Sequence, residues 1–225
     1  MGVEHTAYLT AVWRKMGKLD MTSLRDVPFR TKMIGYMMGW LDPASVDTIV
    51  QRTIIIDAVL AGLQKEHIVE IGAGLSTRRE RFPRSVVYTL DLPSFPIQKE
   101  NFIPYAIGTD SLEVPFSDAV FVVEGVSMYL EKLQLKKMLK EIVALKGHVV
   151  IDFFDKSKGS KYKSYREHLY KQLFSRVSGK DKPFSFAVEN AEHARKLLAS
   201  CGFTEIEELR LPLKKTLDIL FYAKC

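Results

Sequence analysis

The residues with the clearest chemical potential are a carboxylate and two glycines at the end of an apolar run. Residues 68–77 read IVEIGAGLST, so Glu70 comes two residues before Gly72, and Gly74 follows. Glycine lets a backbone turn sharply and approach a ligand closely. The third glycine of a dinucleotide fingerprint is replaced by Thr77, and the carboxylate of Glu70 would repel a pyrophosphate. The pattern therefore favours a cationic ligand over a dinucleotide.

Three more carboxylates end the next apolar runs. Asp91 comes 17 residues after Gly74, where an acid can accept both hydroxyls of a ribose. Asp110 closes the third run, where it could accept from an adenine amino group, and Glu124 closes the fourth. Any one of these acids could instead be a helix cap or a surface acid, but four in register indicate one ligand site. A cationic ligand that carries adenine and ribose is S-adenosylmethionine.

These side chains need a sheet whose strands end at one edge. From residue 67 onwards, short β-rich runs alternate with helical segments, which indicates crossover connections and a largely parallel sheet. Two final β runs with a short link must pair antiparallel. The expected strands are 67–71, 86–90, 102–108, 119–123, 148–154, 205–211 and 216–223, and the expected helices are 3–19, 28–40, 49–63, 77–81, 131–145, 161–178 and 190–201. This outline resembles the class I methyltransferase fold: a Rossmann-like α/β domain with a seven-stranded, mostly parallel sheet, a C-terminal antiparallel hairpin and helices on both faces.

Length and composition fit one globular domain. With 225 residues, 47% hydrophobic and 27% charged, the chain is not of the disordered, collagen-like or coiled-coil class. Its apolar runs are too short to span a membrane and no apolar leader begins it, so we expect a cytoplasmic protein without a membrane partner. The Met- and aromatic-rich face of residues 28–40 is expected in the core, or alternatively in a substrate pocket. We divide the chain into an N-terminal helical cap, a cofactor-binding core, a basic lid segment, and a C-terminal helix and hairpin, at 1–45, 46–155, 156–187 and 188–225.

The net charge of +6 is concentrated in one segment. Residues 156–182 hold seven Lys and two Arg against two acids, a surplus of +7, so the remaining chain sums to −1. Aromatic residues interleave with these lysines. We expect either a solvated helix or a lid in which Lys161, Lys163 and Arg166 attract an anionic acceptor.

Four stretches of the chain resemble the leucine carboxyl methyltransferase family, which also contains polyketide O-methyltransferases. They are WLDP at 40–43, RT with an acid at 52–57, the stretch 69–93 that holds the glycine turn, and VEGVSMYL at 123–130. The resemblance implies that Arg52 pairs with the methionine carboxylate, that Asp91 holds the ribose, and that Tyr129 lies near the methyl group. It implies a cofactor site formed by Arg52, Glu70, Gly72, Ala73, Gly74, Asp91, Leu92, Asp110, Ser111, Leu112, Glu124 and Gly125.

The expected reaction needs alignment more than acid–base help. Methyl transfer from a sulfonium is an in-line displacement, and a carboxylate acceptor is already ionised at neutral pH. Tyr129 is therefore only a weak catalytic candidate, and no metal is expected. We expect an S-adenosylmethionine-dependent O-methyltransferase that acts on a carboxylate or hydroxyl of a small, anionic molecule or peptide. Two alternatives stay open: an RNA methyltransferase that uses residues 156–182, although no RNA-binding module is appended, and a protein that binds the cofactor without transferring its methyl group.

Overall fold

The strands form one seven-stranded sheet in the order β3-β2-β1-β4-β5-β7-β6. The computed structural model describes residues 4–19, 24, 27–95, 100–159, 185–213, 216 and 218–225. The first five strands pair in parallel, whereas β7 pairs antiparallel with both β5 and β6. This arrangement confirms the predicted fold class. The strands are β1 (His67–Ile71), β2 (Val86–Asp91), β3 (Phe102–Pro104), β4 (Val120–Val123), β5 (His148–Phe154), β6 (Glu205–Leu209) and β7 (Asp218–Lys224).

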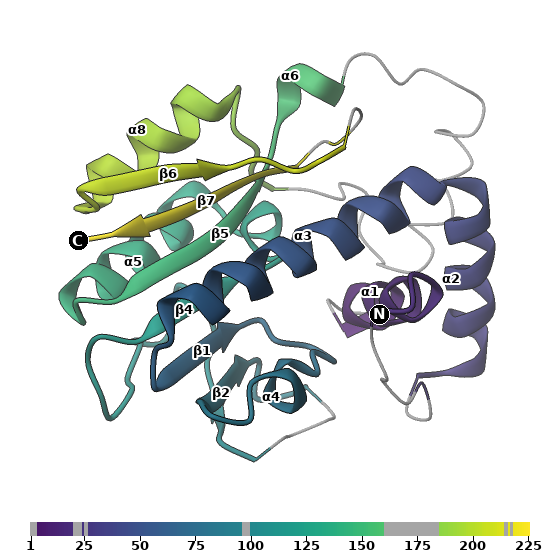
Figure 1. Ribbon diagram of the computed structural model, residues 1–225, viewed down its shortest axis with the longest axis horizontal. Helices are drawn as coiled ribbons and strands as arrows, with labels where there is room; N and C mark the ends of the chain where they lie inside the picture. Colours follow the sequence, from purple (N-terminus) through teal and green to yellow (C-terminus); the bar gives the residue numbers. More distant parts are fainter. Residues whose placement is uncertain are drawn as a thin grey trace.

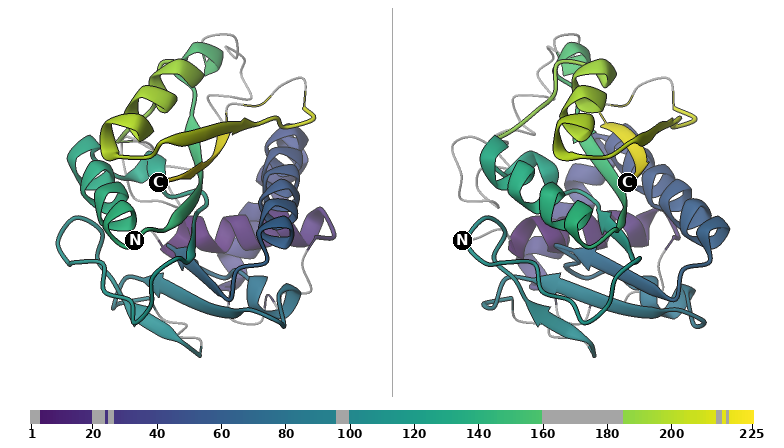
Figure 2. Two further views of the ribbon diagram at one scale, coloured as in Figure 1. Left: turned by 60° about the vertical axis from the view of Figure 1, so that its left-hand side comes forward. Right: turned by 90° about the vertical axis from the view of Figure 1, so that its left-hand side faces the viewer.

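Helices cover both faces of the sheet, with α3 on one side and α5 and α8 on the other (Figures 1 and 2). Side chains alternate between the faces of a strand. Val122 and Val150 accordingly pack with Ile56 of α3, whereas Val123 and Ile151 face the core that α5 and α8 share. The helices are α1 (Glu4–Met16), α2 (Phe29–Leu41), α3 (Pro43–Leu63), α4 (Arg78–Arg81), α5 (Lys132–Ala144), α6 (Lys156–Gly159) and α8 (Ala191–Cys201), with a 3₁₀ turn η2 (Ser127–Tyr129).

Helix α3 is the longest of these and begins earlier than the sequence pattern predicts. Pro43 occupies the first helical turn, where its missing N–H is not needed. Asp42 caps the helix, because its carboxylate accepts from the backbone N–H of Ser45 at 3.3 Å and from the Ser45 hydroxyl at 2.6 Å. The WLDP stretch therefore starts α3 directly after α2 and does not open a loop.

The third strand is shorter than predicted. The expected run was 102–108, but β3 ends at Pro104, and the chain turns at Ala106, whose carbonyl accepts from the N–H groups of Thr109 and Asp110. A proline cannot donate to a ladder, so it disfavours continuation of the strand. Asp110 consequently lies in this turn and not at the end of a strand.

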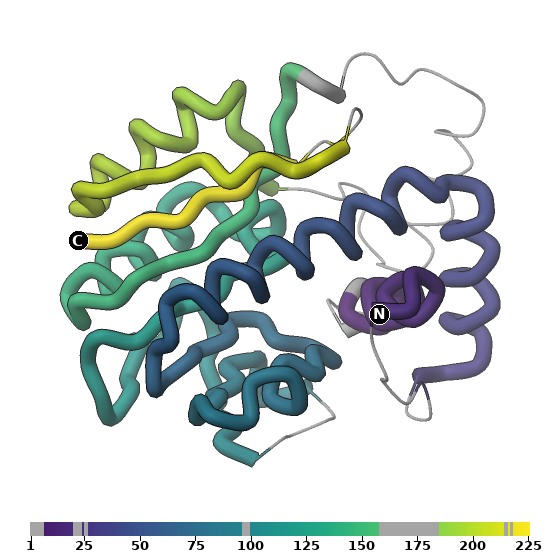
Figure 3. Tube along the Cα trace, in the orientation of Figure 1, coloured from purple at the N-terminus to yellow at the C-terminus, as the bar shows by residue number. Residues whose placement is uncertain are grey.

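The exposure of α2 corrects, for most of its large side chains, the expectation that they form core. Thr31, Gly35, Met38 and Gly39 are the buried residues of this helix. A Cβ at Gly35 would lie 3.0 Å from Val12 Cγ1, which shows how closely α1 approaches here. Phe29, Met33, Tyr36, Met37 and Trp40 are exposed, whereas Met38 is fully buried. Helix α2 stands at the edge of the molecule (Figure 3). No helix among the described residues is long and apolar enough to cross a membrane.

Candidate functional site

The glycine turn after β1 has the conformation that its sequence predicts. Gly72 and Gly74 have φ values of +67° and +51°, a region that favours glycine. The Gly72 N–H donates to the Leu90 carbonyl at 2.7 Å, so the turn is tied to β2. A Cβ at Gly72 would lie 2.4 Å from Val126 Cγ2, and one at Gly74 would lie 2.9 Å from Ala7 Cβ. The turn is therefore covered closely by α1 and by the segment after β4.

Asp91 joins the end of β2 to this turn. Its Oδ2 accepts from the Gly74 N–H at 2.8 Å, and its Oδ1 accepts from the Leu92 N–H at 2.8 Å. Asp91, Leu92 and Ala73 are all half-buried. The structure thus brings these predicted site residues together at one sheet edge, where open α/β sheets bind ligands.

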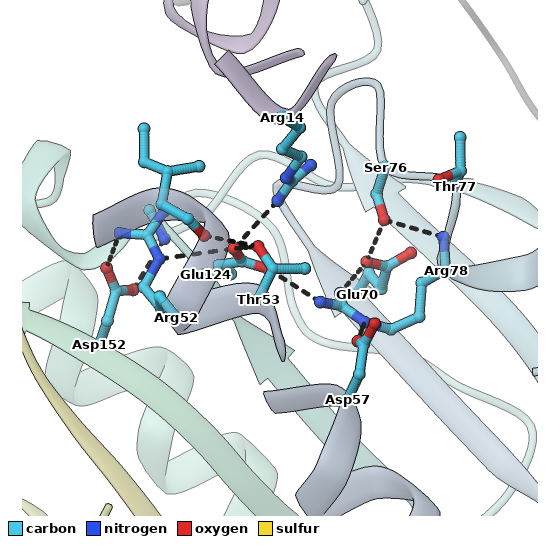
Figure 4. A network of polar contacts seen from close by, with 12 residues as sticks. Arg14, Arg52, Thr53, Asp57, Glu70, Ser76, Thr77, Arg78, Glu124 and Asp152 are labelled. Carbon is cyan, nitrogen blue, oxygen red and sulfur yellow. Dashed lines mark hydrogen bonds and ion pairs between the residues drawn. The ribbon is translucent and has the colours of Figure 1, made fainter. Parts of the chain in front are cut away.

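A buried network of charges lies beside the turn, on the α3 face of the sheet (Figure 4). Strand alternation places its acids there, since Glu70 shares a face with Ile68, Glu124 with Val122, and Asp152 with Val150. Arginines from α1, α3 and α4 meet these acids. Among the described residues, the carboxylates outnumber the guanidinium groups by one; the acids are Asp57, Glu70, Glu124, Asp152 and Asp218, and the arginines are Arg14, Arg52, Arg78 and Arg81.

Arg52 of α3 is buried among three carboxylates. Its Nη1 lies 2.6 Å from Asp152 Oδ2 and 2.8 Å from Asp218 Oδ2, and its Nε lies 3.4 Å from Glu124 Oε1. Burial alone would lower the pKa of Arg52, but the three anions raise it above its ordinary value. The remaining Nη2 lies 3.2 Å from the position that a Cβ would take at Gly125, whose φ is +70°. Pairing of Arg52 with a methionine carboxylate stays a prediction.

Glu124 contacts arginines from three helices. Its Oε1 accepts from the Thr53 hydroxyl at 2.5 Å and lies 3.0 Å from Arg14 Nη2, while its Oε2 accepts from Arg78 at 2.8 Å. Burial opposes ionisation, but Arg14, Arg78, Arg52 and the Thr53 hydroxyl hold the pKa of Glu124 well below its usual range. Glu124 is therefore ionised, and both of its oxygens are already engaged by the protein.

Glu70 is satisfied on only one side. Its Oε1 accepts from Arg78 and from the Ser76 hydroxyl, the latter at 2.7 Å. Its Oε2 is buried and has no hydrogen-bond partner among the described residues. The same is true of Arg14 Nε, a donor. The network thus includes a buried acceptor and a buried donor whose hydrogen bonds are not made, and leaving such a bond unmade is costly.

Asp152 is a buried acid that shares Arg52 with Asp218. Burial raises the pKa of Asp152 to about 6, against the opposing effects of Arg52 and of the Gly125 N–H, which donates to its Oδ1 at 2.7 Å. Asp218 adds to the rise because the two anions repel each other.

Arg14, Arg78 and Asp152 are network residues to which the sequence patterns assign no role. A signal for Arg14 was available: Ala7, Ala11 and Arg14 follow helical spacing, which indicates a second buried side of α1 made of small residues. Asp152 interrupts an otherwise apolar strand, as Glu70 does. The ion pair between Arg52 and Asp152 could not be predicted from the sequence, because the two residues are 100 positions apart.

Of the three residues predicted to contact adenine, two lie at the surface and one lies in the core. Asp110 and Ser111 are exposed, and the Asp110 carboxylate accepts from the Ala106 N–H of its own turn at 2.7 Å. Leu112 is buried in the core on the α5 side. Tyr129 is half-buried in η2, near the end of β4. Their contacts with a cofactor stay predictions.

Two further predictions meet the limits of the described chain. Lys161, Lys163 and Arg166 lie outside the described residues, as does the predicted helix 161–178, and only 156–159 and 185–187 of the basic segment are described. In the part of the chain that the structure describes, no group of His, Cys, Asp and Glu is placed to hold a metal ion.

A shallow groove of about 440 Å³ runs along α5, on the opposite side of the sheet from the network, and is lined by Leu133, Lys136, Lys137, Lys140, Glu141 and Ala144.

Comparison with solved structures identifies the architecture. The chain is similar to a candidate methyltransferase from Thermobifida fusca, with 9% identity and a TM-score of 0.64 over 97% of this chain and 93% of the other. It is similar to a DUF574 family protein from Streptomyces avermitilis, with 11% identity and a TM-score of 0.59 over 96% of each chain. The chain is also similar to human N-acetylserotonin methyltransferase, with 12% identity and a TM-score of 0.53 over 98% of this chain and 66% of the other.

The chain has the class I methyltransferase fold. At these identities the likeness extends to the fold alone. No protein-family model and no curated protein sequence matches the chain.

Proposed function

We propose that this protein is a cytoplasmic, S-adenosylmethionine-dependent O-methyltransferase of the leucine carboxyl methyltransferase type. Its acceptor is a carboxylate or hydroxyl of a small, anionic molecule or peptide. One observation carries the cofactor assignment: beside the glycine turn, the network of buried charges includes a donor, Arg14 Nε, and an acceptor, Glu70 Oε2, that have no hydrogen-bond partner among the described residues.

These two atoms suit the methionine end of the cofactor. That end is zwitterionic, so its carboxylate can accept from a guanidinium and its ammonium can donate to a carboxylate. The network also carries one more carboxylate than guanidinium in the described residues, which favours a ligand with a positive sulfonium. The ribose would be held by Asp91, whose oxygens already fix the turn on which the ligand would lie.

The cofactor supplies an electrophilic methyl group, and the chain supplies position and desolvation. Gly72 and Gly74 form the turn at the end of β1 where the ligand would lie, and Asp91 orients it. Tyr8 and Trp13 of α1 pack with Leu75 and Phe95 in an apolar cluster that excludes water from this edge. Because Ala7 lies against Gly74, we infer that α1 shifts when the ligand enters. A carboxylate acceptor would attack without a general base.

Calorimetric titration with S-adenosylmethionine and S-adenosylhomocysteine tests the cofactor site. We expect wild-type protein to bind both and Asp91→Asn to bind at least about tenfold more weakly, because a charged acceptor contributes about 1.5 to 3 kcal/mol per hydrogen bond. Glu205→Gln, which removes an exposed acid on β6, should bind as the wild type does. Absence of binding by the wild type would refute the proposal. Transfer of labelled methyl groups to a panel of carboxylic acids and phenols then identifies the acceptor.

A further inference from the structure

The outward side of α2 presents a continuous apolar surface. Its two end residues are the most exposed, Phe29 at 74% and Trp40 at 78%. At the helical repeat, the large side chains of this side fall within an arc of about 100°. We call them the α2 stripe: Phe29, Met33, Tyr36, Met37 and Trp40.

Among the described residues, the α2 stripe is not part of any apolar core cluster. The opposite side of α2, with Gly35 and Gly39, packs against α1 through close backbone approach. Most of the exposed large apolar side chains among the described residues belong to this one helix. Monomeric proteins rarely expose such a contiguous patch unless it binds something.

Positive charge borders the α2 stripe on both sides. By helical geometry, Arg30 follows one edge of the stripe and Lys32 precedes the other, and the sequence FRTKMIGYMMGWL contains no acid. Aromatic residues at the helix ends and basic residues at the polar boundary are typical of helices that lie in a membrane interface. We propose that α2 docks in the plane of an anionic lipid bilayer, with the stripe in the lipid and Arg30 and Lys32 at the headgroups.

Charge complementarity favours this occupant over a second copy of the chain. In heptad terms Phe29, Met33, Tyr36 and Trp40 occupy the a and d positions, which places Arg30 and Lys32 at e and g. Two copies that paired through the stripe would bring these like charges together, whereas an anionic surface neutralises both. The expectation of no membrane partner rested on the lack of a spanning segment, and lying on a surface requires none. The proposal does not depend on methyl transfer.

Tryptophan fluorescence gives a direct measurement. The chain has two tryptophans. Trp13 is buried and donates to the Gly35 carbonyl at 2.9 Å, so a change in emission on binding reports Trp40. We expect a blue shift and co-sedimentation with vesicles that contain phosphatidylglycerol, and much weaker binding to phosphatidylcholine alone. Absence of binding to the anionic vesicles overturns the proposal.

Variants separate the apolar and the charged contributions. Met33→Glu with Met37→Glu should weaken vesicle binding at least tenfold, and Arg30→Gln or Lys32→Gln about fivefold each on anionic vesicles only. Leu133→Glu on α5 changes a large apolar residue that is still more exposed, at 79%, and should bind like the wild type. An equal loss in Leu133→Glu would contradict the proposal. So would a dimer in light scattering that the stripe variants dissociate while vesicle binding is absent. Unchanged thermal unfolding confirms that each variant is folded.

Discussion

At the scale of single residues, Asp152 and Asp218 show why this site is sensitive to pH. Both carboxylates contact the same nitrogen of Arg52, and neither is open to solvent. One cation cannot fully compensate two desolvated anions, so the more deeply buried acid holds its proton to a higher pH. Asp152 is that acid, with a pKa raised to about 6 by burial and by Asp218.

The direction of this shift predicts a pH-dependent stability. Because the pKa of Asp152 is higher in the folded protein than in the unfolded chain, its contribution is complete below the unfolded value and is lost as pH rises through about 6. Asp152→Asn mimics the protonated form of Asp152, so this residue should cause no fall in the variant's free energy of unfolding as pH rises through about 6. Urea unfolding between about pH 4 and pH 7 should show the wild type losing about 2 to 3 kcal/mol relative to the variant.

An exposed acid, Asp118, gives the opposite dependence of stability on pH and serves as a comparison. Asp118 pairs with Lys65 at 2.6 Å, and this hydrogen bond lowers the pKa of Asp118. Asp118 therefore stabilises the folded protein at pH values above its pKa in the unfolded chain, and this stabilisation is lost on acidification, opposite to the effect of Asp152. If wild type and Asp152→Asn gave parallel curves of stability against pH, the proton would not reside on Asp152.

At the scale of elements, the packing of α1 on α2 determines how the glycine turn is covered. A Cβ at Gly35 would already lie 3.0 Å from Val12, so Gly35→Leu should force the two helices apart and destabilise the protein by about 1 to 3 kcal/mol. It should also weaken S-adenosylmethionine binding, because α1 carries both Ala7 and Arg14 to the site. Thermal unfolding and calorimetry on the same samples measure both effects.

A second helical glycine offers the matched substitution. A Cβ at Gly62, in the last turn of α3, would meet nothing within 4 Å. Gly62→Leu should therefore leave stability unchanged or raise it by up to about 1 kcal/mol, since leucine favours helix more than glycine does. Equal destabilisation by the two substitutions would show that the spacing of α1 and α2 is not the cause.

Element types were predictable from sequence where a single pattern decided them. β1 and β5 begin and end as predicted, because each is an apolar run bounded by polar residues. The orientation of α2 was not predictable, since large apolar residues occur on more than one side of this helix and do not reveal which side is buried. The glycine turn was predictable from local sequence. The contacts of Arg52 with Asp152 and Asp218 were not, because they depend on which distant strands become neighbours.

At the scale of the whole molecule, the topology explains why these distant residues meet. The strand order reverses between β1 and β4, and ligands of open α/β sheets bind at such a switch point. The glycine turn follows β1 and Glu124 follows β4, so the two lie on either side of it. α3 then lies across the face of the sheet (Figure 1) and carries Arg52 to Glu124, which follows β4, and to the acids of β5 and β7.

Charge is distributed unevenly over the molecule, and this predicts where an anionic acceptor is attracted. The segment 156–182 has a surplus of +7, while the rest of the chain sums to −1. If this segment recruits the acceptor, replacing Lys161, Lys163 and Arg166 together with glutamine should raise the KM for a carboxylate acceptor several-fold and leave kcat nearly unchanged. The reason is that attraction acts before the chemical step.

A second triple variant distinguishes local recruitment from a general effect of net charge. Lys132, Lys136 and Lys140 on α5 carry the same total charge, on the face of the sheet opposite the charge network. Their replacement with glutamine lowers the net charge equally and should leave KM unchanged at physiological salt, where the field of an exposed charge is screened beyond about 8 Å. Equal increases in both variants would mean that the total charge attracts the acceptor. No increase in either would mean that the basic segment has no part in binding it.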